Sequence, residues 1–343
     1  MTETTSYRAV GLQTTCRAIA SCRTTEEART RIGENIERVA RQIPSTIAWT
    51  GPDTRLIVLP EYLLTGFPTR ETADEWISRA CLSEGCSEYE ELGAVAEKNA
   101  IFLAGNAYEF DAHFPGIFFQ TSFVIDPSGD VVLRYRRLNS MYSPTPHDVW
   151  DAYLDRYGLD GVFPVAKTEI GRLAAVASEE ILYPELTRCL AMRGAEVIVH
   201  STCEVGSPRS TPKGIAKRAR AIENLVYVVS ANTAGMEGLD LPGASADGGS
   251  VVIDHKGRVL AEAGYGESVV AYADLDLDAL RRFRRRPGME NLLSRQRFEA
   301  YAESYANHSH YPANSLADGF QGKKHFTETQ AEVIERLVKN GVI

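Results

Sequence analysis

The stretch RLAAVASEEILYPE, residues 172–185, begins as a small apolar run and ends abruptly at polar residues. Residues 172–177 have the short, continuous apolar composition of a buried strand. A helix is predicted to start at residues 183–185, because proline suits the first helical turn, where its missing N–H is not needed. A strand, a sharp turn and a helix in succession place the turn residue, Ser178, at the mouth of a sheet. Many enzymes carry a nucleophile and an oxyanion hole at such a position.

On both sides of this stretch, predicted strands alternate with predicted helices. Residues 55–59 and 197–200 are further short apolar runs, and residues 162–168 are predicted as a strand. Residues 118–125 and 131–135 flank the turn sequence DPSGD and predict a hairpin. A helix that packs one apolar face on a sheet is predicted from apolar residues at helical spacing, Ile32, Ile36, Val39 and Ile43. This alternation predicts one α/β domain with mixed strand directions.

Two regions have a less regular pattern. Residues 139–158 contain two prolines and no clear period, so they predict a functional loop with a short helix from Pro146 to Arg156. The last part of the chain is irregular and then helical, and it is too short to fold alone. We therefore expect one domain over residues 1–286 and a C-terminal extension, residues 287–343, that wraps the domain or a partner subunit.

Composition excludes several classes of protein. The 343 residues carry 37 basic and 46 acidic side chains, a formal charge of −9, which disfavours binding to nucleic acid or to an anionic membrane. The basic cluster at residues 281–286 is interpreted as a solvated or subunit-facing helix end. A polar N-terminus and the lack of a long apolar run predict neither a signal peptide nor a membrane span.

Cysteine usage bears on the compartment and on metal binding. The six cysteines form neither CxxC pairs nor a regular disulfide framework, which predicts reduced thiols in a cytoplasmic protein. No histidine or cysteine spacing typical of a metal site is present, so we expect no metal ion and no cofactor. The expected partner is a small-molecule substrate or ligand.

Three polar residues follow predicted strands: Glu61, Arg137 and Ser178. A glutamate at a strand end can act as a general base if its pKa is raised. A cation beside it can hold an oxyanion, and a nucleophile at a turn completes an acyl-transfer site. Each residue also has a structural interpretation: Glu61 as a helix cap, Arg137 as a surface charge and Ser178 as a turn residue. Spacing alone leaves both interpretations open.

Taken together, these segments resemble the three signature blocks of the nitrilase superfamily, the carbon–nitrogen hydrolases. The blocks are LPEY at residues 59–62, YRRL at 135–138 and SEEILYPE at 178–185, in the family's order and spacing. Supporting matches are GNAYE at 105–109, AMRGAE at 191–196 and RARAIEN at 218–224. Because several independent blocks occur in the right order across most of the chain, chance similarity is improbable.

The resemblance implies a four-layer α-β-β-α sandwich with mixed sheets. Subunits of the family usually pair through helices near the site and through the C-terminal segment, which implies a homodimer or a larger homo-oligomer. Family members hydrolyse the C–N bond through a thioester with a Glu–Lys–Cys triad, in which Glu is the base, Lys stabilises the tetrahedral intermediate and Cys is the nucleophile. By this resemblance Glu61 is the base, Arg137 stands at the lysine position and Ser178 stands at the cysteine position.

Both departures from the family act against ordinary turnover. A serine hydroxyl is a weaker nucleophile than a partly ionised thiol. Arg137 can donate hydrogen bonds to an oxyanion, but it cannot give up a proton at neutral pH. We also expect it to form a bidentate pair with Glu61, which would lower the proton affinity of that carboxylate. Because two positions differ, we favour natural divergence over an engineered change.

Three hypotheses follow. The first is acyl transfer on a small amide, nitrile or N-carbamoyl compound, with Ser178 as nucleophile, Glu61 as base, and Arg137 and the Glu179 N–H as oxyanion donors. The second is a catalytically inactive nitrilase-fold protein that binds a ligand or regulates. The third is relocated chemistry that uses Cys203, although a small packing role for this residue is favoured.

Substrate contacts are predicted from the loops at residues 142–150 and 203–210, because loops that line a rigid site usually set specificity. Their aromatic and polar side chains suggest an aromatic pocket with some hydrogen-bonding capacity. The predicted contact residues are Tyr62, Tyr142, His147, Trp150, Glu179 and Cys203.

Overall fold

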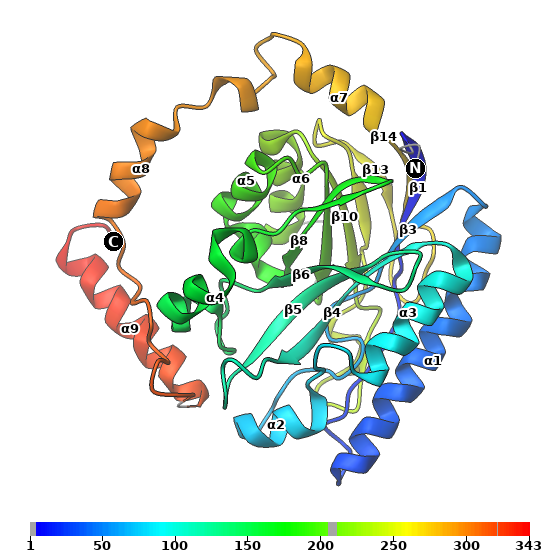
Figure 1. Ribbon diagram of the computed structural model, residues 1–343, viewed down its shortest axis with the longest axis horizontal. Coiled ribbons are helices and arrows are strands. Elements are labelled where there is room, and N and C mark those ends of the chain that lie inside the picture. Colours follow the sequence, from blue (N-terminus) through cyan, green and yellow to red (C-terminus); the bar gives the residue numbers. More distant parts are fainter. Residues whose placement is uncertain (1–4, 205–210, 321) are drawn as a thin grey trace.

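The computed structural model describes residues 5–204, 211–320 and 322–343. Two six-stranded sheets lie face to face at its centre, with helices on the outer face of each (Figure 1). Three clusters of buried apolar side chains fill the spaces between the four layers. The structure confirms the predicted α-β-β-α sandwich.

Each sheet has parallel strands at its centre and antiparallel strands at its edges. In spatial order, the first sheet contains β14 (Tyr272–Asp276), β1 (Ser6–Gly11), β3 (Thr54–Val58), β4 (Phe102–Phe110), β5 (Phe118–Ile125) and β6 (Val131–Arg136). The second contains β13 (Val259–Glu262), β12 (Val251–Ile253), β10 (Tyr227–Asn232), β9 (Val197–Thr202), β8 (Gly171–Ala177) and β7 (Ala166–Thr168). A small parallel pair is formed by β2 (Cys16–Arg17) and β11 (Met236–Glu237). Mixed strand directions were predicted and are confirmed.

The central strands are apolar on both faces, because both faces are covered. In β8, Leu173, Ala175 and Ala177 pack between the two sheets, whereas Ala174 and Val176 pack toward the outer helices. The two sets alternate because successive side chains of a strand point to opposite faces. This explains why residues 172–177 form a continuous apolar run.

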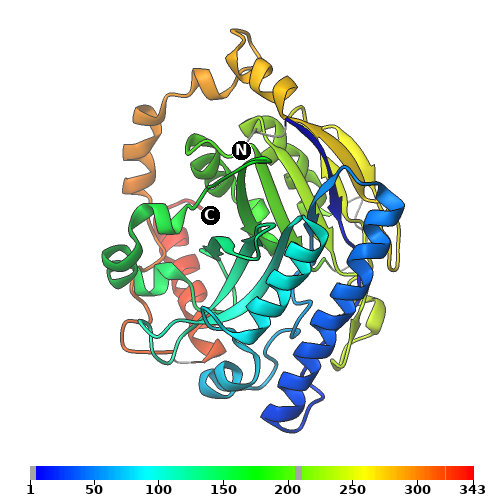
Figure 2. The same cartoon turned by 45° about the vertical axis from the view of Figure 1, so that its right-hand side comes forward.

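Helices from two regions of the chain cover the two sheets (Figure 2). The first sheet is covered by α1 (Thr25–Thr50) and α3 (Ser87–Asn99), with α2 (Ala73–Ala80) at one end. The second is covered by α5 (Pro184–Met192) and α6 (Pro212–Asn224). The apolar face predicted for the first helix is confirmed, because Ile32, Ile36, Val39 and Ile43 are all buried.

One predicted strand is wrong. Residues 162–168 were predicted as a strand, but α4 (Trp150–Val162) runs to Val162 and only Ala166–Thr168 pair as β7. Val162 and Tyr153 are buried in an aromatic cluster with Phe119, so tertiary packing decides the conformation here. The short helix predicted from Pro146 is present as the 3-10 helix η1 (Pro146–Val149), which leads into α4.

Helix α7 (Leu277–Arg285) is held on the domain by two members of the basic cluster. Arg281 Nε donates to Glu196 Oε1 at 2.6 Å, and Arg284 Nε donates to the Leu225 carbonyl at 2.9 Å. The interpretation of this cluster as a solvated or subunit-facing helix end is therefore wrong for these two arginines. Both arginines bind the domain because Glu196 and the carbonyl at the end of α6 lie beside α7.

Beyond α7 the chain leaves the domain as an arm and later returns to it (Figures 1 and 2). The arm contains η4 (Leu293–Arg295), α8 (Phe298–Asn307) and α9 (Lys323–Lys339). Leu316 and Phe326 pack into the aromatic cluster beside α4. In the described part of the chain, no helix combines the length and the apolar composition needed to cross a membrane.

Gly11, on β1, marks a close approach of the two sheets. A Cβ atom added here would lie 2.7 Å from the Ser230 carbonyl oxygen on β10. Backbone cannot move aside as a side chain can, so Gly11→Ala should lower the free energy of unfolding by about 1–3 kcal/mol. Urea unfolding followed by circular dichroism measures this change.

A matched control is Gly33→Ala on α1, where an added Cβ atom meets nothing within 4 Å. This variant should be neutral or stabilised by up to about 1 kcal/mol, because alanine is the better helix former. Equal unfolding midpoints for both variants would contradict the close approach at Gly11.

Candidate active site

Glu61 lies where β3 of the first sheet meets β9 of the second. Its side chain is fully buried. The Glu61 N–H donates to the Thr202 carbonyl at 3.4 Å, and the Ser201 hydroxyl donates to the Leu59 carbonyl at 2.7 Å. These two contacts tie the carboxyl ends of β3 and β9 together, and they hold the Glu61 carboxylate between the sheets.

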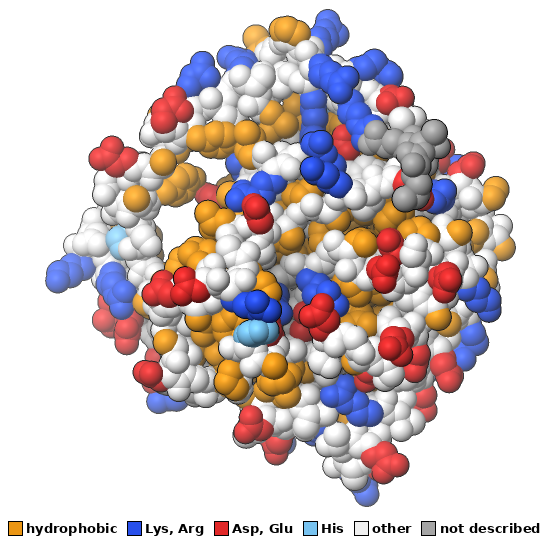
Figure 3. All heavy atoms as spheres, in the orientation of Figure 1, with side chains coloured by type: hydrophobic (Ala, Val, Ile, Leu, Met, Phe, Trp, Pro, Cys, Tyr) orange, Lys and Arg blue, Asp and Glu red, His pale blue; other side chains and the backbone are white. Residues whose placement is uncertain are grey.

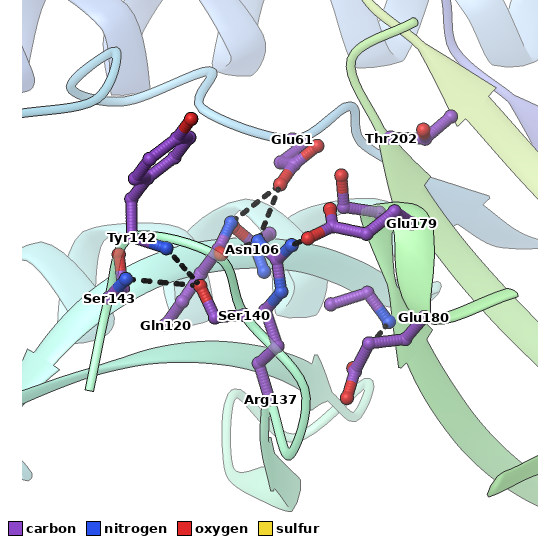
Figure 4. A network of polar contacts seen from close by, with 12 residues as sticks. Glu61, Asn106, Gln120, Arg137, Ser140, Tyr142, Ser143, Glu179, Glu180 and Thr202 are labelled. Carbon is purple, nitrogen blue, oxygen red and sulfur yellow. Dashed lines mark hydrogen bonds and ion pairs between the residues drawn. The ribbon is translucent and has the colours of Figure 1, made fainter. Parts of the chain in front are cut away.

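The Glu61 carboxylate is paired on one oxygen only. Gln120 Nε2, from β5, donates to Glu61 Oε1 at 2.7 Å and also to Asn106 Oδ1 at 3.1 Å (Figure 4). The other oxygen, Oε2, is buried and has no hydrogen-bond partner within residues 5–204, 211–320 and 322–343. Oε2 is therefore available to receive a proton.

Arg137, just beyond β6, is bound by four neighbours. Its Nη1 lies 3.5 Å from Glu61 Oε1 and also donates to Gln120 Oε1. Its Nη2 pairs with the Glu179 carboxylate, and its Nε donates to the Asn139 carbonyl at 2.8 Å (Figure 4). The expected bidentate pair with Glu61 is not formed, because Gln120 and Glu179 compete for the guanidinium.

Burial raises the pKa of Glu61, although the positive charges of Arg137 and Lys213 act to lower it. Arg137 lowers the proton affinity of Glu61, as expected. Burial has the larger effect, however, so the pKa of Glu61 is raised overall. A carboxylate with a raised pKa is a better proton acceptor, which is what a general base requires.

Ser178 is buried and begins the 3-10 helix η2 (Ser178–Leu182) directly after β8. Its φ of 50° lies in the left-handed region, which costs a non-glycine residue about 1–3 kcal/mol. The His200 ring donates from Nε2 to the Ser178 carbonyl at 2.8 Å and contacts the Ser230 hydroxyl through Nδ1 at 2.9 Å. Burial holds the pKa of His200 well below its usual value, so this histidine is neutral and positions the turn.

Backbone strain of this kind gathers at the site. In the described residues, the other non-glycine residues with a positive φ are Tyr62, Ala100, Leu225 and Asn314. Ala100 and Leu225 end helices, where the left-handed conformation is common, and asparagine tolerates it. Ser178 and Tyr62 have no such local reason, and Tyr62 directly follows Glu61.

Lys213 is a site residue that the sequence did not indicate. It lies in the first turn of α6, and its Nζ is 3.4 Å from both Ser178 Oγ and Thr202 Oγ1. No signature block contains it. One turn further along, the buried Lys217 pairs with the buried Glu204.

Glu180 links the two segments that carry Arg137 and Ser178. Its Oε1 accepts from the N–H groups of Leu138 and Asn139, both at 2.7 Å, and the Tyr135 hydroxyl donates to it at 2.9 Å. Glu180 is fully buried, and burial raises its pKa to about 7. This link could not be predicted from the sequence, because an acidic residue in a turn is ordinarily exposed.

The predicted contact residues occupy different surroundings. Glu179 pairs with Arg137, as described above. Tyr142 is exposed and lies in the loop after Arg137, beside Ser140 (Figure 4). Tyr62 packs instead in the apolar interior, with its ring stacked on Tyr108 at 6.3 Å between centroids.

His147 and Trp150 lie against each other, with ring centroids 5.6 Å apart, and His147 also faces Tyr311 of the extension. In the described residues, no hydrogen bond or ion pair joins either of them to Glu61 or Ser178. Of the predicted loop at residues 203–210, residues 205–210 lie outside the described residues.

Cys203 lies near Glu61 but is a poor candidate for a nucleophile. Its thiol is 3.5 Å from Met236 Sδ, in a small apolar cluster. Burial, and then the charge of Glu61, raise the pKa of this thiol to about 12. Because only the thiolate attacks efficiently, the raised pKa argues against Cys203 as a nucleophile. No group of three or more His, Cys, Asp or Glu side chains within the described residues could hold a metal ion.

Comparison with known proteins gives one family match and several relatives. The sequence profile of the carbon-nitrogen hydrolase family matches residues 10–285. Formamidases of Bacillus thuringiensis (strain Al Hakam) and Bacillus cereus (strain AH820) are each 29% identical over 223 residues, which is 62% of this chain and 60% of the relative. The chain therefore spans about 60% of the length of these curated relatives.

Solved structures show the same fold. A member of branch 10 of the nitrilase superfamily from Saccharomyces cerevisiae has a TM-score of 0.65 at 22% identity, covering 82% of this chain and 94% of that one. An amidase from Nesterenkonia sp. has a TM-score of 0.61 at 21% identity, covering 89% of this chain and 98% of that one.

The pKa of Glu180 makes stability depend on pH. The folded chain binds the Glu180 proton more tightly than an unfolded chain does, whose glutamate titrates near 4.5. The unfolding free energy should therefore fall as pH rises from about 4.5 to about 7. Glutamine does not ionise, so the unfolding free energy of Glu180→Gln should not fall in this way. Over this pH range it should rise relative to that of the wild type by up to about 3 kcal/mol. Urea unfolding at several pH values measures the difference.

The matched control is Glu97→Gln, at an exposed position on α3. Its unfolding free energy should equal that of the wild type at every pH. The assignment to Glu180 fails if the pH dependence of Glu180→Gln also parallels that of the wild type.

Proposed function

The chain belongs to the carbon-nitrogen hydrolase family, and we propose that it hydrolyses the C–N bond of a small amide, nitrile or N-carbamoyl compound at Ser178. The observation that carries the proposal is the buried Glu61, with a raised pKa and one unpaired oxygen, in a site that also contains a serine on a strained turn. A base and a nucleophile held together in a buried place are the minimum for acyl transfer.

The steps for an amide follow from these positions. Ser178 Oγ attacks the carbonyl carbon, the Oγ–C bond forms, and Glu61 takes the hydroxyl proton. When the C–N bond breaks, the leaving nitrogen takes that proton from Glu61. Water then attacks the ester and Glu61 takes a proton from it; as the Oγ–C bond breaks, Glu61 returns that proton to Ser178 Oγ and the carboxylic acid leaves.

Charge stabilisation comes from Arg137 and from the Glu179 N–H. The first N–H groups of a 3-10 helix have no partner within it, and Glu179 is the second residue of η2. Arg137 is already held by Glu61, Gln120 and Glu179, so it acts as a fixed positive charge beside the oxyanion.

The comparisons bear on the substrate. The curated relatives named above are formamidases, which supports a small amide over a nitrile.

A second candidate is a catalytically inactive ligand-binding or regulatory protein. One observation favours it: the guanidinium of Arg137 is occupied by two carboxylates, Glu61 and Glu179, before any substrate arrives. Part of its charge is therefore already neutralised, which weakens its effect on an oxyanion.

Ser178→Ala tests the proposed nucleophile. Because alanine cannot form the ester, hydrolysis of small amides should fall at least about a thousandfold, which is about 4 kcal/mol in activation free energy. Ammonia release measures the rate, and Ser78→Ala, at an exposed serine on α2, serves as the control. An unchanged rate in Ser178→Ala would exclude Ser178 as the nucleophile.

If the wild type hydrolyses no compound of these three classes, the ligand-binding candidate is favoured. The double variant Ser178→Cys, Arg137→Lys should then show activity that the wild type lacks.

We also propose that the chain assembles into a homodimer or a larger homo-oligomer through α5 and α8. Figure 3 shows an open gap between the arm and the domain, with hydrophobic side chains around it. Large apolar side chains on these two helices, or just before α5, are between 39% and 62% exposed: Leu182 and Tyr183 before α5, Met192 on α5, and Phe298, Tyr301 and Tyr305 on α8. Exposed apolar surface of this extent is typical of an interface.

Light scattering after size exclusion tests this assembly. The wild type should have at least twice the chain mass of 37.8 kDa, and Phe298→Ser with Tyr301→Ser should lower it. Trp49→Ser, at an exposed aromatic residue on α1, should leave the mass unchanged. A wild type with the mass of one chain would contradict the assembly.

A further inference from the structure

Lys213 brings a second positive charge to Ser178 from outside the signature blocks. Its ammonium lies 3.4 Å from Ser178 Oγ and 3.4 Å from Thr202 Oγ1. We propose that Lys213 is a catalytic residue that stabilises the negative charge developing on Ser178 Oγ, in place of the lysine that the chain lacks at position 137. This proposal rests on the function proposed above.

The place of Lys213 on its helix argues against a purely structural role. Thr211 caps α6, Pro212 is its first residue, and Lys213 follows in the same turn. A cation in the first turn opposes the helix dipole, at a cost of about 0.3–1 kcal/mol, and this turn holds no acidic residue to offset it. Because Lys213 weakens its own helix, its presence is better explained by the groups that its side chain contacts.

The contacts of Lys213 differ from those of its neighbour Lys217. Lys217 is buried against Glu204, so its charge is matched within the folded chain. In the described part of the chain, Lys213 contacts two neutral hydroxyls and forms no ion pair with a carboxylate. Its charge is therefore still available when a negative charge appears on Ser178.

Arg137 cannot take this role equally well. Its Nε and both terminal nitrogens already bind Asn139, Gln120, Glu61 and Glu179. In the described residues no hydrogen bond joins Arg137 to Ser178 Oγ, whereas Lys213 is within hydrogen-bond distance of it. Of the two cations, Lys213 is the one placed at the nucleophile.

The proton balance assigns distinct roles to Glu61 and Lys213. As the Oγ–C bond forms, the hydroxyl proton passes to Glu61 and later to the leaving nitrogen. Lys213 takes no part in this proton transfer and donates a hydrogen bond to Oγ while that atom carries negative charge. The divergent site would thus keep one base and one lysine-derived cation, with the lysine supplied by α6.

An introduced thiol at position 178 tests the charge directly and needs no turnover. The pKa of the thiol in Ser178→Cys should be at least about one unit lower than in the double variant Ser178→Cys, Lys213→Met, because a nearby cation favours the thiolate. Alkylation by iodoacetamide across a pH series, quantified for that peptide by mass spectrometry, measures both values. Glu61 and His200 also face this position, and Arg137 pairs with the neighbouring Glu179; all four residues are unchanged between the two variants.

Two further variants serve as controls in the Ser178→Cys background. Lys213→Arg should keep most of the lowered pKa, and Lys98→Met, at an exposed lysine on α3, should leave it unchanged. Equal thiol pKa values with and without the charge at position 213 would overturn the proposal, whether or not the wild type is an enzyme.

Activity gives the second measurement. In the wild-type background, Lys213→Met should lower kcat/KM for amides at least tenfold, and Lys213→Arg should retain part of the activity. An unchanged kcat/KM would overturn the catalytic role. If the wild type shows no turnover, the proposed function fails, and the thiol comparison still decides whether the charge of Lys213 acts on residue 178.

Discussion

A carboxylate buried between two sheets must be paired, hydrogen-bonded or protonated, and the rest of this site depends on how Glu61 meets that constraint. Gln120 satisfies one oxygen, Arg137 supplies a charge at 3.5 Å, and the second oxygen stays unpaired. Burial outweighs the nearby positive charges, so the group keeps a high affinity for a proton. A fully paired carboxylate would be more stable there and less useful as a base.

The same constraint shapes the surroundings of Glu61. A second buried glutamate, Glu180, accepts hydrogen bonds from the backbone beyond Arg137 and from Tyr135. It fixes the Arg137 loop relative to the turn at Ser178, which is the geometry that a preorganised site needs. Two buried carboxylates thus have different surroundings: Glu61 keeps one unpaired oxygen, and Glu180 links two segments of the chain.

Much of the fold could be predicted from the sequence, because its signals are local. Continuous apolar runs predicted β3, β8 and β9, and helical spacing of isoleucine and valine predicted α1. The prediction was wrong at residues 162–168, where packing of Val162 and Tyr153 in an aromatic cluster extends α4. It was also wrong for Arg281 and Arg284, which bind groups distant in the sequence.

The sequence by itself determined the order of the elements and the positions of Glu61, Arg137 and Ser178, because each follows a strand at a recognisable block. Only the tertiary structure decided what those residues contact. Gln120 comes from a strand 59 residues beyond Glu61, and Lys213 from a helix 35 residues beyond Ser178. Glu61 meets Gln120 because β3 and β5 both pair with β4 in the first sheet, and Ser178 meets Lys213 because α6 packs on the outer face of the second sheet, beside the end of β8.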